Sequence, residues 1–215
     1  MVDAVIFDGD GVVFDSEELS VLAFRRTLER YGLKLTREEC GRFIGAGTSE
    51  LLDILRGEYG LQINEHEYIV DRDQVYEECC LEVNGPQPMP GIVSVLDWLE
   101  TKDIPWAMAT SASREKLAFN FERTGLAARF PVAVLGEDVA NGKPAPDIFI
   151  EAARRLGVDP KRCIVMEDSL NGLRGAIAAG CAVIAIEGSH SRSELLKLTA
   201  RVCKNPVEAI AMMDL

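Results

Sequence analysis

The sequence has little of what several common enzyme and metal-binding classes need. Only two of its 215 residues are histidines, His66 and His190, and they are far apart. This leaves little support for a histidine-based metal site or a Ser-His-Asp triad. The six cysteines show no CxxC spacing, and a chain of this length needs no disulfide to hold its core. We therefore expect reduced, mostly buried thiols.

Long apolar runs and positive charge are also scarce. No apolar stretch reaches the roughly 18 residues of a membrane span, and the first residues lack the pattern of a signal peptide. We therefore expect a cytoplasmic protein that does not bind a membrane. The formal net charge of -12 disfavours nucleic acid as a partner, because phosphates attract a basic surface. If the substrate is an anion, positive charge must be concentrated locally.

Two carboxylates stand where the first apolar run ends. Val5, Ile6 and Phe7 predict a buried strand that stops at the glycines around Asp8 and Asp10. The two aspartates would share one side of a continued strand and would repel each other without a cation or a proton. This pair suggests a divalent metal site with oxygen ligands suited to Mg²⁺. Taken alone, however, Asp-x-Asp-Gly is often only a turn.

The pattern from residue 16 to residue 87 is helical. Asp15 is placed to cap a first helix, with Glu18 three residues later, and Thr36 with Glu39 forms a second capping box. Three prolines between residues 84 and 91 then form a stiff connection of the kind found at domain edges.

After residue 91 the chain alternates between helices and strands. Helices are predicted from Ile92 and over residues 147–156 and 169–179, and strands over residues 104–109, 132–135, 163–166 and 182–186. This alternation predicts an α/β fold with a doubly wound parallel sheet.

Polar clusters follow the strands at one predicted edge of this sheet, where such folds build their sites. Asp8 and Asp10 follow the first strand, and the others are Thr110-Ser111-Ala-Ser113, Lys143-Pro144 and Glu167-Asp168-Ser169. Alone, each has an ordinary explanation: a helix cap, a surface lysine or an acidic pair at a strand end. Together, in sheet order, the four clusters are much harder to explain as ordinary features.

The chemistry follows from the residue types. Mg²⁺ between Asp8 and Asp168 would offset their repulsion and orient a phosphate oxygen. Asp8 could attack phosphorus, and Asp10 could protonate the leaving oxygen and later deprotonate water. Thr110 and Lys143 would bind the remaining phosphate oxygens.

The four motifs resemble those of the haloacid dehalogenase superfamily, and most closely its β-phosphoglucomutase-like subgroup. The motifs are Phe-Asp-Gly-Asp-Gly-Val-Val-Phe-Asp-Ser-Glu from Phe7, Ala-Thr-Ser-Ala-Ser from Ala109, Gly-Lys-Pro-Ala-Pro-Asp-Ile-Phe from Gly142 and Met-Glu-Asp-Ser-Leu-Asn-Gly from Met166. The resemblance implies a Rossmann-like core formed by residues 1–15 and 88–215. It also implies a small helical cap, residues 16–87, inserted after the first strand.

The resemblance also implies a role for each site residue. Asp8 is then the nucleophile, and Asp10 is the general acid/base, with its backbone carbonyl on the metal. Asp168 is a direct metal ligand, and Glu167 lies at or near the metal. Thr110 holds phosphate beside Ser111, and Lys143 steadies the nucleophile and the phosphate. Members of that family usually carry a larger residue between the two aspartates, so Gly9 is expected to loosen this loop.

Departures from the resemblance favour hydrolysis over mutase chemistry. Ser20, Ile44 and Thr48 stand where the mutases carry a histidine, a lysine and an arginine, so a second phosphate clamp is missing. We therefore predict a Mg²⁺-dependent phosphatase that acts on a small phosphorylated metabolite, a sugar phosphate, through an aspartyl-phosphate. The alternatives are a β-phosphoglucomutase-type phosphomutase and a non-catalytic binding protein of the same fold.

The loop after the second predicted helix is the candidate specificity element. Arg42, Phe43 and Ile44 would lie over the leaving group, and closure of the cap would exclude water. The alternative is that this loop is a hinge of the cap with two buried apolar residues. We expect a monomer or a weak homo-oligomer.

Overall fold

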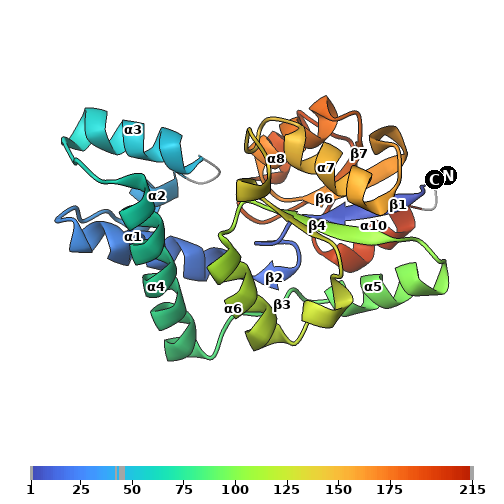
Figure 1. Ribbon diagram of the computed structural model, residues 1–215, viewed down its shortest axis with the longest axis horizontal. Coiled ribbons are helices and arrows are strands. Elements are labelled where there is room, and N and C mark those ends of the chain that lie inside the picture. The colour runs from blue at the N-terminus through green and yellow to red at the C-terminus, as the bar shows by residue number, and fades with distance from the viewer. Residues whose placement is uncertain (1, 42, 44–46, 214–215) are drawn as a thin grey trace. The chain divides into compact units, whose positions relative to one another are not determined.

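The described chain forms two compact units (Figure 1). The computed structural model describes residues 2–41, 43 and 47–213. The sheet unit comprises Met1–Asp15 and Gln87–Leu215, and the helical unit comprises Ser16–Pro86. The chain enters the helical unit once and leaves it once, so this unit is an insertion into the sheet unit.

A parallel sheet forms the centre of the sheet unit. Its strands are β1 (Ala4–Phe7), β4 (Trp106–Thr110), β5 (Ala133–Leu135), β6 (Cys163–Glu167), β7 (Ala182–Ile186) and β8 (Val202–Cys203). Within the described residues their order is β5-β4-β1-β6-β7-β8, and all neighbours run parallel. All four residues of β1 are fully buried, as expected of a central strand covered on both faces.

Helices cover both faces of this sheet. One face packs against α5 (Ile92–Thr101), α6 (Arg114–Thr124) and α10 (Pro206–Met213). The other packs against α7 (Asp147–Leu156), α8 (Leu170–Ala178) and α9 (Arg192–Leu195) (Figure 1). Short 3₁₀ turns lie at Ala127–Arg129, Gly136–Asp138 and Pro160–Arg162. The predicted doubly wound α/β fold is confirmed.

The first strand ends in a tight turn that leads into a short second strand. The Asp8 amide donates to the Met166 carbonyl at 2.9 Å, and the Val13 and Phe14 amides both donate to the Gly9 carbonyl at 2.9 Å. The chain then forms β2 (Phe14–Asp15), which pairs antiparallel with β3 (Gln87–Pro88). Asp8 and Asp10 are therefore placed at the carboxyl end of β1.

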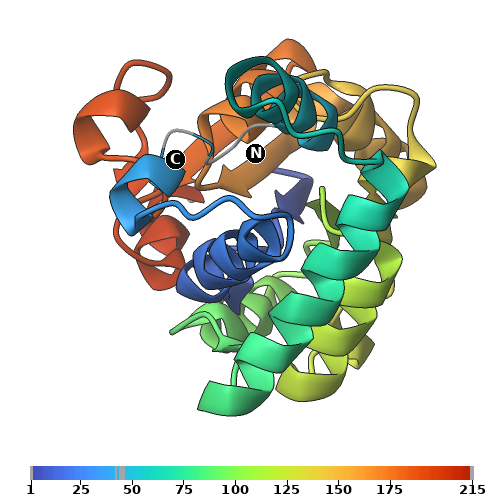
Figure 2. The same ribbon diagram turned by 90° about the vertical axis from the view of Figure 1, so that its left-hand side faces the viewer.

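The helical unit consists of α1 (Glu17–Arg30), α2 (Arg37–Gly41), α3 (Thr48–Tyr59) and α4 (Glu65–Val83). Helix α4 packs across α1, as Figure 2 shows. A separate apolar core holds the unit together, and its fully buried members include Leu28, Leu55 and Tyr68. No described helix combines the length and the apolar character of a membrane span.

Most predicted helix boundaries agree with the structure, but one cap is wrong. Thr36 and Glu39 form the predicted capping box, since the Thr36 amide donates to Glu39 Oε2 at 2.7 Å and the Glu39 amide donates to Thr36 Oγ1 at 3.2 Å. Asp15 does not cap α1; Ser16 stands at that position, with no side-chain cap hydrogen bond. Pairing with Gln87 holds Asp15 in β2, one residue too early for a cap.

Candidate active site

Three buried carboxylates meet where β1 and β6 end. Because these strands are parallel neighbours, Asp8 comes to lie beside Glu167 and Asp168. The exposed fractions of the three residues are 8%, 0% and 4%. One carboxylate oxygen of each lies within 4.8 Å of the others. Among the described residues, this is the group of acidic side chains able to hold a metal ion.

Lys143 places an ammonium group in the middle of this cluster. Its Nζ donates to Asp8 Oδ1 at 2.5 Å, to Glu167 Oε2 at 2.8 Å and to the Ala109 carbonyl at 3.0 Å. It also lies 5.2 Å from the centre of the Phe149 ring. Burial opposes the charged ammonium, but the carboxylates of Asp8 and Glu167 outweigh this effect and raise the pKa of Lys143.

Asp8 lies in an environment that disfavours its ionised form. Burial and the neighbouring Glu167 carboxylate raise its pKa from 3.8 to about 7, although Lys143 acts in the opposite direction. A pKa this far from the ordinary value is typical of functional carboxylates. A cation bound at the cluster would restore the ionised form that a nucleophile needs.

Asp10 faces a second lysine, which the sequence analysis did not identify. Lys116 Nζ donates to Asp10 Oδ2 at 2.7 Å. The side chain of Asp10 is 34% exposed, whereas that of Lys116 is 9% exposed. The carboxylate of Asp10 thus has access to solvent while its cationic partner lies inside the sheet unit.

Thr110 is the last residue of β4, the other neighbour of β1, and Ser111 follows it. Thr110 is 2% exposed, and its Oγ1 accepts from the Ala112 amide at 3.1 Å. Ser111 is exposed. Ser113 ends this segment as the N-cap of α6, and its side chain accepts from the Lys116 amide. The segment therefore combines hydroxyl groups with the start of a helix, an arrangement suited to an anion.

Further hydrogen bonds hold the acidic residues at the end of β6. Glu167 Oε1 accepts from the Ser169 amide at 3.1 Å and from the Ser169 hydroxyl at 2.8 Å. Ser189, in the loop after β7, donates its hydroxyl to Asp168 Oδ2 at 2.6 Å. A Cβ on Gly11, whose φ is 74°, would lie 2.4 Å from the same oxygen. No sequence motif points to Ser189, because its place depends on the packing of a loop.

Of the three residues predicted to determine specificity, only Phe43 is among the described residues. Arg42 and Ile44 lie outside the described residues. Phe43 is 6% exposed and belongs to the core of the helical unit. Its ring centre lies 5.5 Å from that of Phe24. This placement favours the structural alternative for Phe43 over contact with a substrate.

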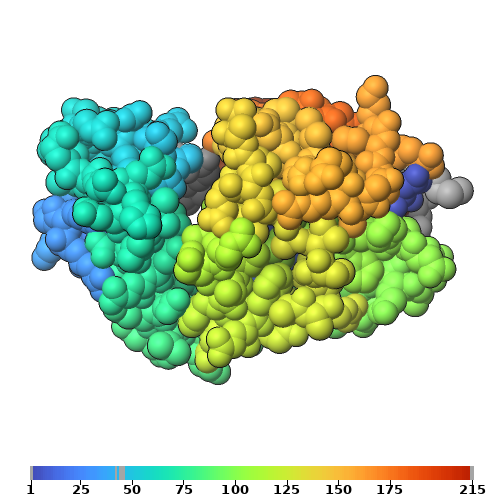
Figure 3. All heavy atoms as spheres, viewed as in Figure 1, coloured from blue at the N-terminus to red at the C-terminus, as the bar shows by residue number. Residues whose placement is uncertain are grey.

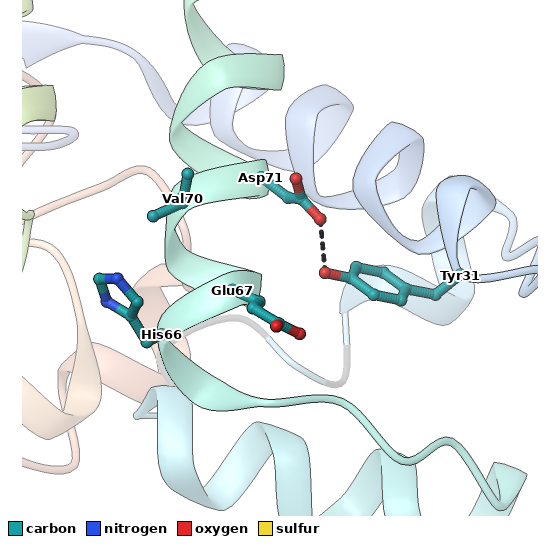
Figure 4. Close-up of a pocket in the computed structure, with 5 residues that line it drawn as sticks. All are labelled: Tyr31, His66, Glu67, Val70 and Asp71. Atoms are coloured by element: carbon teal, nitrogen blue, oxygen red, sulfur yellow. Dashed lines mark hydrogen bonds between the residues drawn. The ribbon is translucent and has the colours of Figure 1, made fainter.

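A surface pocket of the helical unit is lined by Tyr31, His66, Glu67, Val70 and Asp71 (Figure 4). Tyr31 and Asp71 point toward each other, and the Tyr31 hydroxyl donates to Asp71 Oδ2 at 2.5 Å. Burial and this carboxylate raise the pKa of Tyr31 to about 12. His66 and Val70 extend from another side of α4. The pocket therefore lies between the end of α1 and helix α4, and its lining residues bring no set of catalytic groups together.

The cluster in the sheet unit suits a divalent cation. Its carboxylate oxygens are the hard ligands that Mg²⁺ prefers. When Asp8, Asp10, Glu167 and Asp168 are ionised, the ammonium groups of Lys143 and Lys116 leave two negative charges uncompensated among these groups. That is the charge of one divalent cation, so the residues fit the ion.

Comparisons with known proteins agree with this fold. The family model of the haloacid dehalogenase-like hydrolases matches residues 5–186. The phosphorylated carbohydrates phosphatase of Thermotoga maritima is 31% identical over 99% of this chain and 98% of its own length. Hexitol phosphatase A of Escherichia coli is 32% identical over 84% of this chain and 81% of its own.

Solved structures show the same arrangement of elements. The crystal structure of CbbY from Rhodobacter sphaeroides in complex with phosphate superposes with a TM-score of 0.88 at 27% identity, and covers 100% of both chains. The chain belongs to the haloacid dehalogenase-like hydrolase family. Within that family it is a phosphatase enzyme.

Proposed function

We propose that this chain is a magnesium-dependent phosphatase that hydrolyses a small phosphorylated metabolite, a sugar phosphate, by way of an aspartyl-phosphate at Asp8. The observation that carries the proposal is the buried Lys143 ammonium, which bridges Asp8 and Glu167 beside Asp168. The substrate class is supported by two relatives whose names specify phosphorylated carbohydrates and hexitols.

In the first half of the reaction, a carboxylate oxygen of Asp8 attacks phosphorus. The bond between phosphorus and the leaving oxygen breaks, and Asp10 donates a proton to that oxygen. Lys143 holds the Asp8 carboxylate in place through its 2.5 Å hydrogen bond. The products of this half are the free sugar and a phosphoryl group on Asp8.

In the second half, water hydrolyses the aspartyl-phosphate. Asp10, now ionised, takes a proton from the attacking water, and the bond between phosphorus and the Asp8 oxygen breaks. Inorganic phosphate leaves, and the Asp8 carboxylate is restored. Asp10 suits both halves because its side chain is partly exposed while it remains tied to Lys116.

Phosphate binding falls to the residues at the carboxyl end of β4 and to Lys143. The Thr110 hydroxyl, Ser111 and the backbone amides before α6 provide donors for phosphate oxygens, and Lys143 adds a positive charge. This local positive charge explains how a chain of net charge -12 handles an anionic substrate.

Mg²⁺ would be held by Asp8, Asp168 and the backbone carbonyl of Asp10, with Glu167 at or near the ion. When bound, it supplies positive charge that neutralises the carboxylates and orients a phosphate oxygen. Glu167 also has a role of its own, because its two carboxylate oxygens hold Lys143 and Ser169.

The six buried, free cysteines are consistent with a reducing compartment, and we place the enzyme in the cytoplasm on this basis. Its expected partner is the small phosphorylated substrate alone.

The test is release of inorganic phosphate from a panel of phosphorylated metabolites with Mg²⁺ present. Activity on sugar phosphates should be highest, and both Asp8→Asn and removal of the metal with a chelator should abolish it. An isomerised sugar phosphate formed only with added bisphosphate would instead identify a phosphomutase. Phosphate release that survives both treatments would refute the proposal.

A further inference from the structure

Lys116 is a buried lysine in the sheet unit. It belongs to the first turn of α6 and is 8% exposed, although lysine is rarely buried without a charged partner. Helix α6 forms part of the outer surface of the sheet unit (Figure 3). The side chain of Lys116 therefore extends inward from a surface helix, and its Nζ donates to Asp10 Oδ2 at 2.7 Å.

The start of α6 fixes the position of this lysine. The Ser113 side chain accepts from the Lys116 amide at 3.1 Å, so the backbone of Lys116 is tied to the last residue of the segment after β4. That segment directly follows Thr110, to which we assign phosphate binding. The same short stretch of chain thus provides the phosphate donors at its start and the cationic partner of Asp10 at its end.

Lys116 and Lys143 divide the two aspartates between them. Lys143 contacts Asp8 and Glu167, and Lys116 contacts Asp10. Asp10 is the more exposed of the two aspartates, so burial alone does not hold its carboxylate in one orientation. A charge-assisted hydrogen bond of 2.7 Å provides that constraint.

We propose that Lys116 is a positioning residue: its ammonium holds the carboxyl group of Asp10 in the orientation needed for proton transfer to the leaving oxygen. This inference rests on the proposed function, in which Asp10 is the general acid/base. Proton transfer requires hydrogen-bond distance and alignment, and a displacement of about 1 Å can cost on the order of 100-fold in rate. Lys116 contributes without touching phosphorus or the leaving group.

The test compares two substrates that differ in their need for a general acid. The first is the sugar phosphate that the wild-type enzyme hydrolyses best, whose leaving alkoxide is strongly basic. The second is 4-nitrophenyl phosphate, whose leaving phenolate is weakly basic and needs little protonation. The measured quantity is kcat/KM, which reports transfer to Asp8 and does not include the later hydrolysis of the aspartyl-phosphate.

We expect Lys116→Met to lower kcat/KM by about 10- to 100-fold for the sugar phosphate and by less than about 3-fold for 4-nitrophenyl phosphate. The loss for the sugar phosphate should lie in kcat, with KM nearly unchanged. Lys116→Arg, which keeps the charge, should recover part of it. Equal losses for both substrates, or no loss in a folded variant, would overturn the inference.

Lys102→Met is the matched control for the change in net charge. Lys102 follows α5, before β4 begins, and so lies at the edge of the sheet opposite the site. Lys102→Met should leave kcat/KM unchanged for both substrates. If Lys116→Met does not fold, Lys116→Gln is measured with the same two substrates and judged by the same outcomes.

Failure of this inference is distinguishable from failure of the proposed function. If the wild-type enzyme releases phosphate from neither substrate, the proposed function fails, and the role of Lys116 fails with it. If the wild-type enzyme is active and Asp10→Ala loses the sugar phosphate reaction while Lys116→Met does not, only the role of Lys116 is wrong.

Discussion

At the scale of single residues, side-chain size around the aspartates is tightly restricted. A Cβ on Gly9 would lie 2.9 Å from Thr110 Oγ1, and one on Gly11 would lie 2.4 Å from Asp168 Oδ2. The structure thus adds a reason for Gly9 beyond the predicted loosening of the loop: a larger residue would displace Thr110. The turn after β1 approaches both neighbouring strand ends closely because it lacks side chains at these positions.

Ser189 should strengthen metal binding through Asp168. Ser189→Ala removes the hydroxyl that donates to Asp168 Oδ2 at 2.6 Å. Loss of such a partner typically weakens metal affinity about 10- to 100-fold. We expect a fall of this size in Mg²⁺ affinity, measured by calorimetry with the metal alone. Ser191→Ala is the control, because Ser191 is the N-cap of α9 and its hydroxyl donates to Glu194. Equal affinities in the wild type and Ser189→Ala would contradict this role.

Asp8 should make the stability of the metal-free protein depend on pH. The pKa of Asp8 is about 7 in the folded state, whereas its ordinary value is 3.8. Between these two pH values, the folded protein retains a proton on Asp8 that the unfolded chain has lost. The free energy of unfolding must therefore decrease as the pH rises from about 4 to about 7, and this stabilisation is absent above that range. Asp8→Asn carries no charge and should lack this decrease.

Urea denaturation with a chelator present, at about pH 5 and about pH 8, checks this prediction. The advantage of Asp8→Asn over the wild type should grow toward about 2–4 kcal/mol at the higher pH. A constant difference between the two proteins would show that Asp8 titrates normally.

At the scale of secondary-structure elements, the longer helices and strands could be predicted more reliably than the short ones. Residues 147–156 form α7 as predicted, and Gly157 ends it with a φ of 73°. The predicted strand over residues 182–186 is also confirmed as β7. Long apolar runs and helix-ending glycines are local signals, so the sequence reveals them.

The elements that the sequence did not reveal are short or depend on distant partners. Strands β2, β3 and β8 have two residues each, too few to show a period. Lys116 lies in the charged run Arg114-Glu-Lys and looks like a surface residue of α6 until the helix is packed. Its contact with Asp10 joins residues 106 positions apart, which only the tertiary fold can specify.

The packing of α8 against the end of β6 should not tolerate a methyl group. A Cβ on Gly172 would lie 1.9 Å from Glu167 Oε2, and this side chain is fully buried. We expect Gly172→Ala to lower the free energy of unfolding by about 1–3 kcal/mol and to reduce activity, since Glu167 must move. Urea denaturation and phosphate release measure the two effects.

Gly57→Ala is the matched control for Gly172→Ala. Gly57 is also helical, in α3, and a Cβ there would meet nothing within 4 Å. This substitution should stabilise the protein by up to about 1 kcal/mol, because alanine favours helices. If both variants have wild-type stability and activity, the close packing of α8 against Glu167 is not needed.

At the scale of the whole molecule, burial protects the six cysteines, which are all free. Burial raises the pKa of Cys163 to about 11 and that of Cys181 to about 12, so few thiolates form near neutral pH. We expect iodoacetamide to label the native protein far more slowly than the urea-unfolded chain, in which all six thiols react. Mass spectrometry follows the labelling, and rapid reaction of the native protein would contradict the buried placement.

The whole molecule also combines a strongly acidic chain with a local cationic site. Its net charge of -12 coexists with two buried lysines, each paired with a catalytic aspartate under the proposed mechanism. The composition disfavours nucleic acid as a partner, and it requires positive charge to be concentrated locally if the substrate is an anion. Under the proposed function these lysines serve one particular anion, a phosphate, because the fold gathers both of them at the carboxyl ends of β1 and β4.

The central claim is that Asp8 becomes phosphorylated during turnover. The most direct measurement is rapid quenching of the enzyme with its best substrate, followed by reduction with borohydride, which converts an aspartyl-phosphate to homoserine. Peptide mass spectrometry should then find homoserine at position 8, and Asp8→Asn should give none. Homoserine at another carboxylate, or none at any position while phosphate is released, would contradict the account.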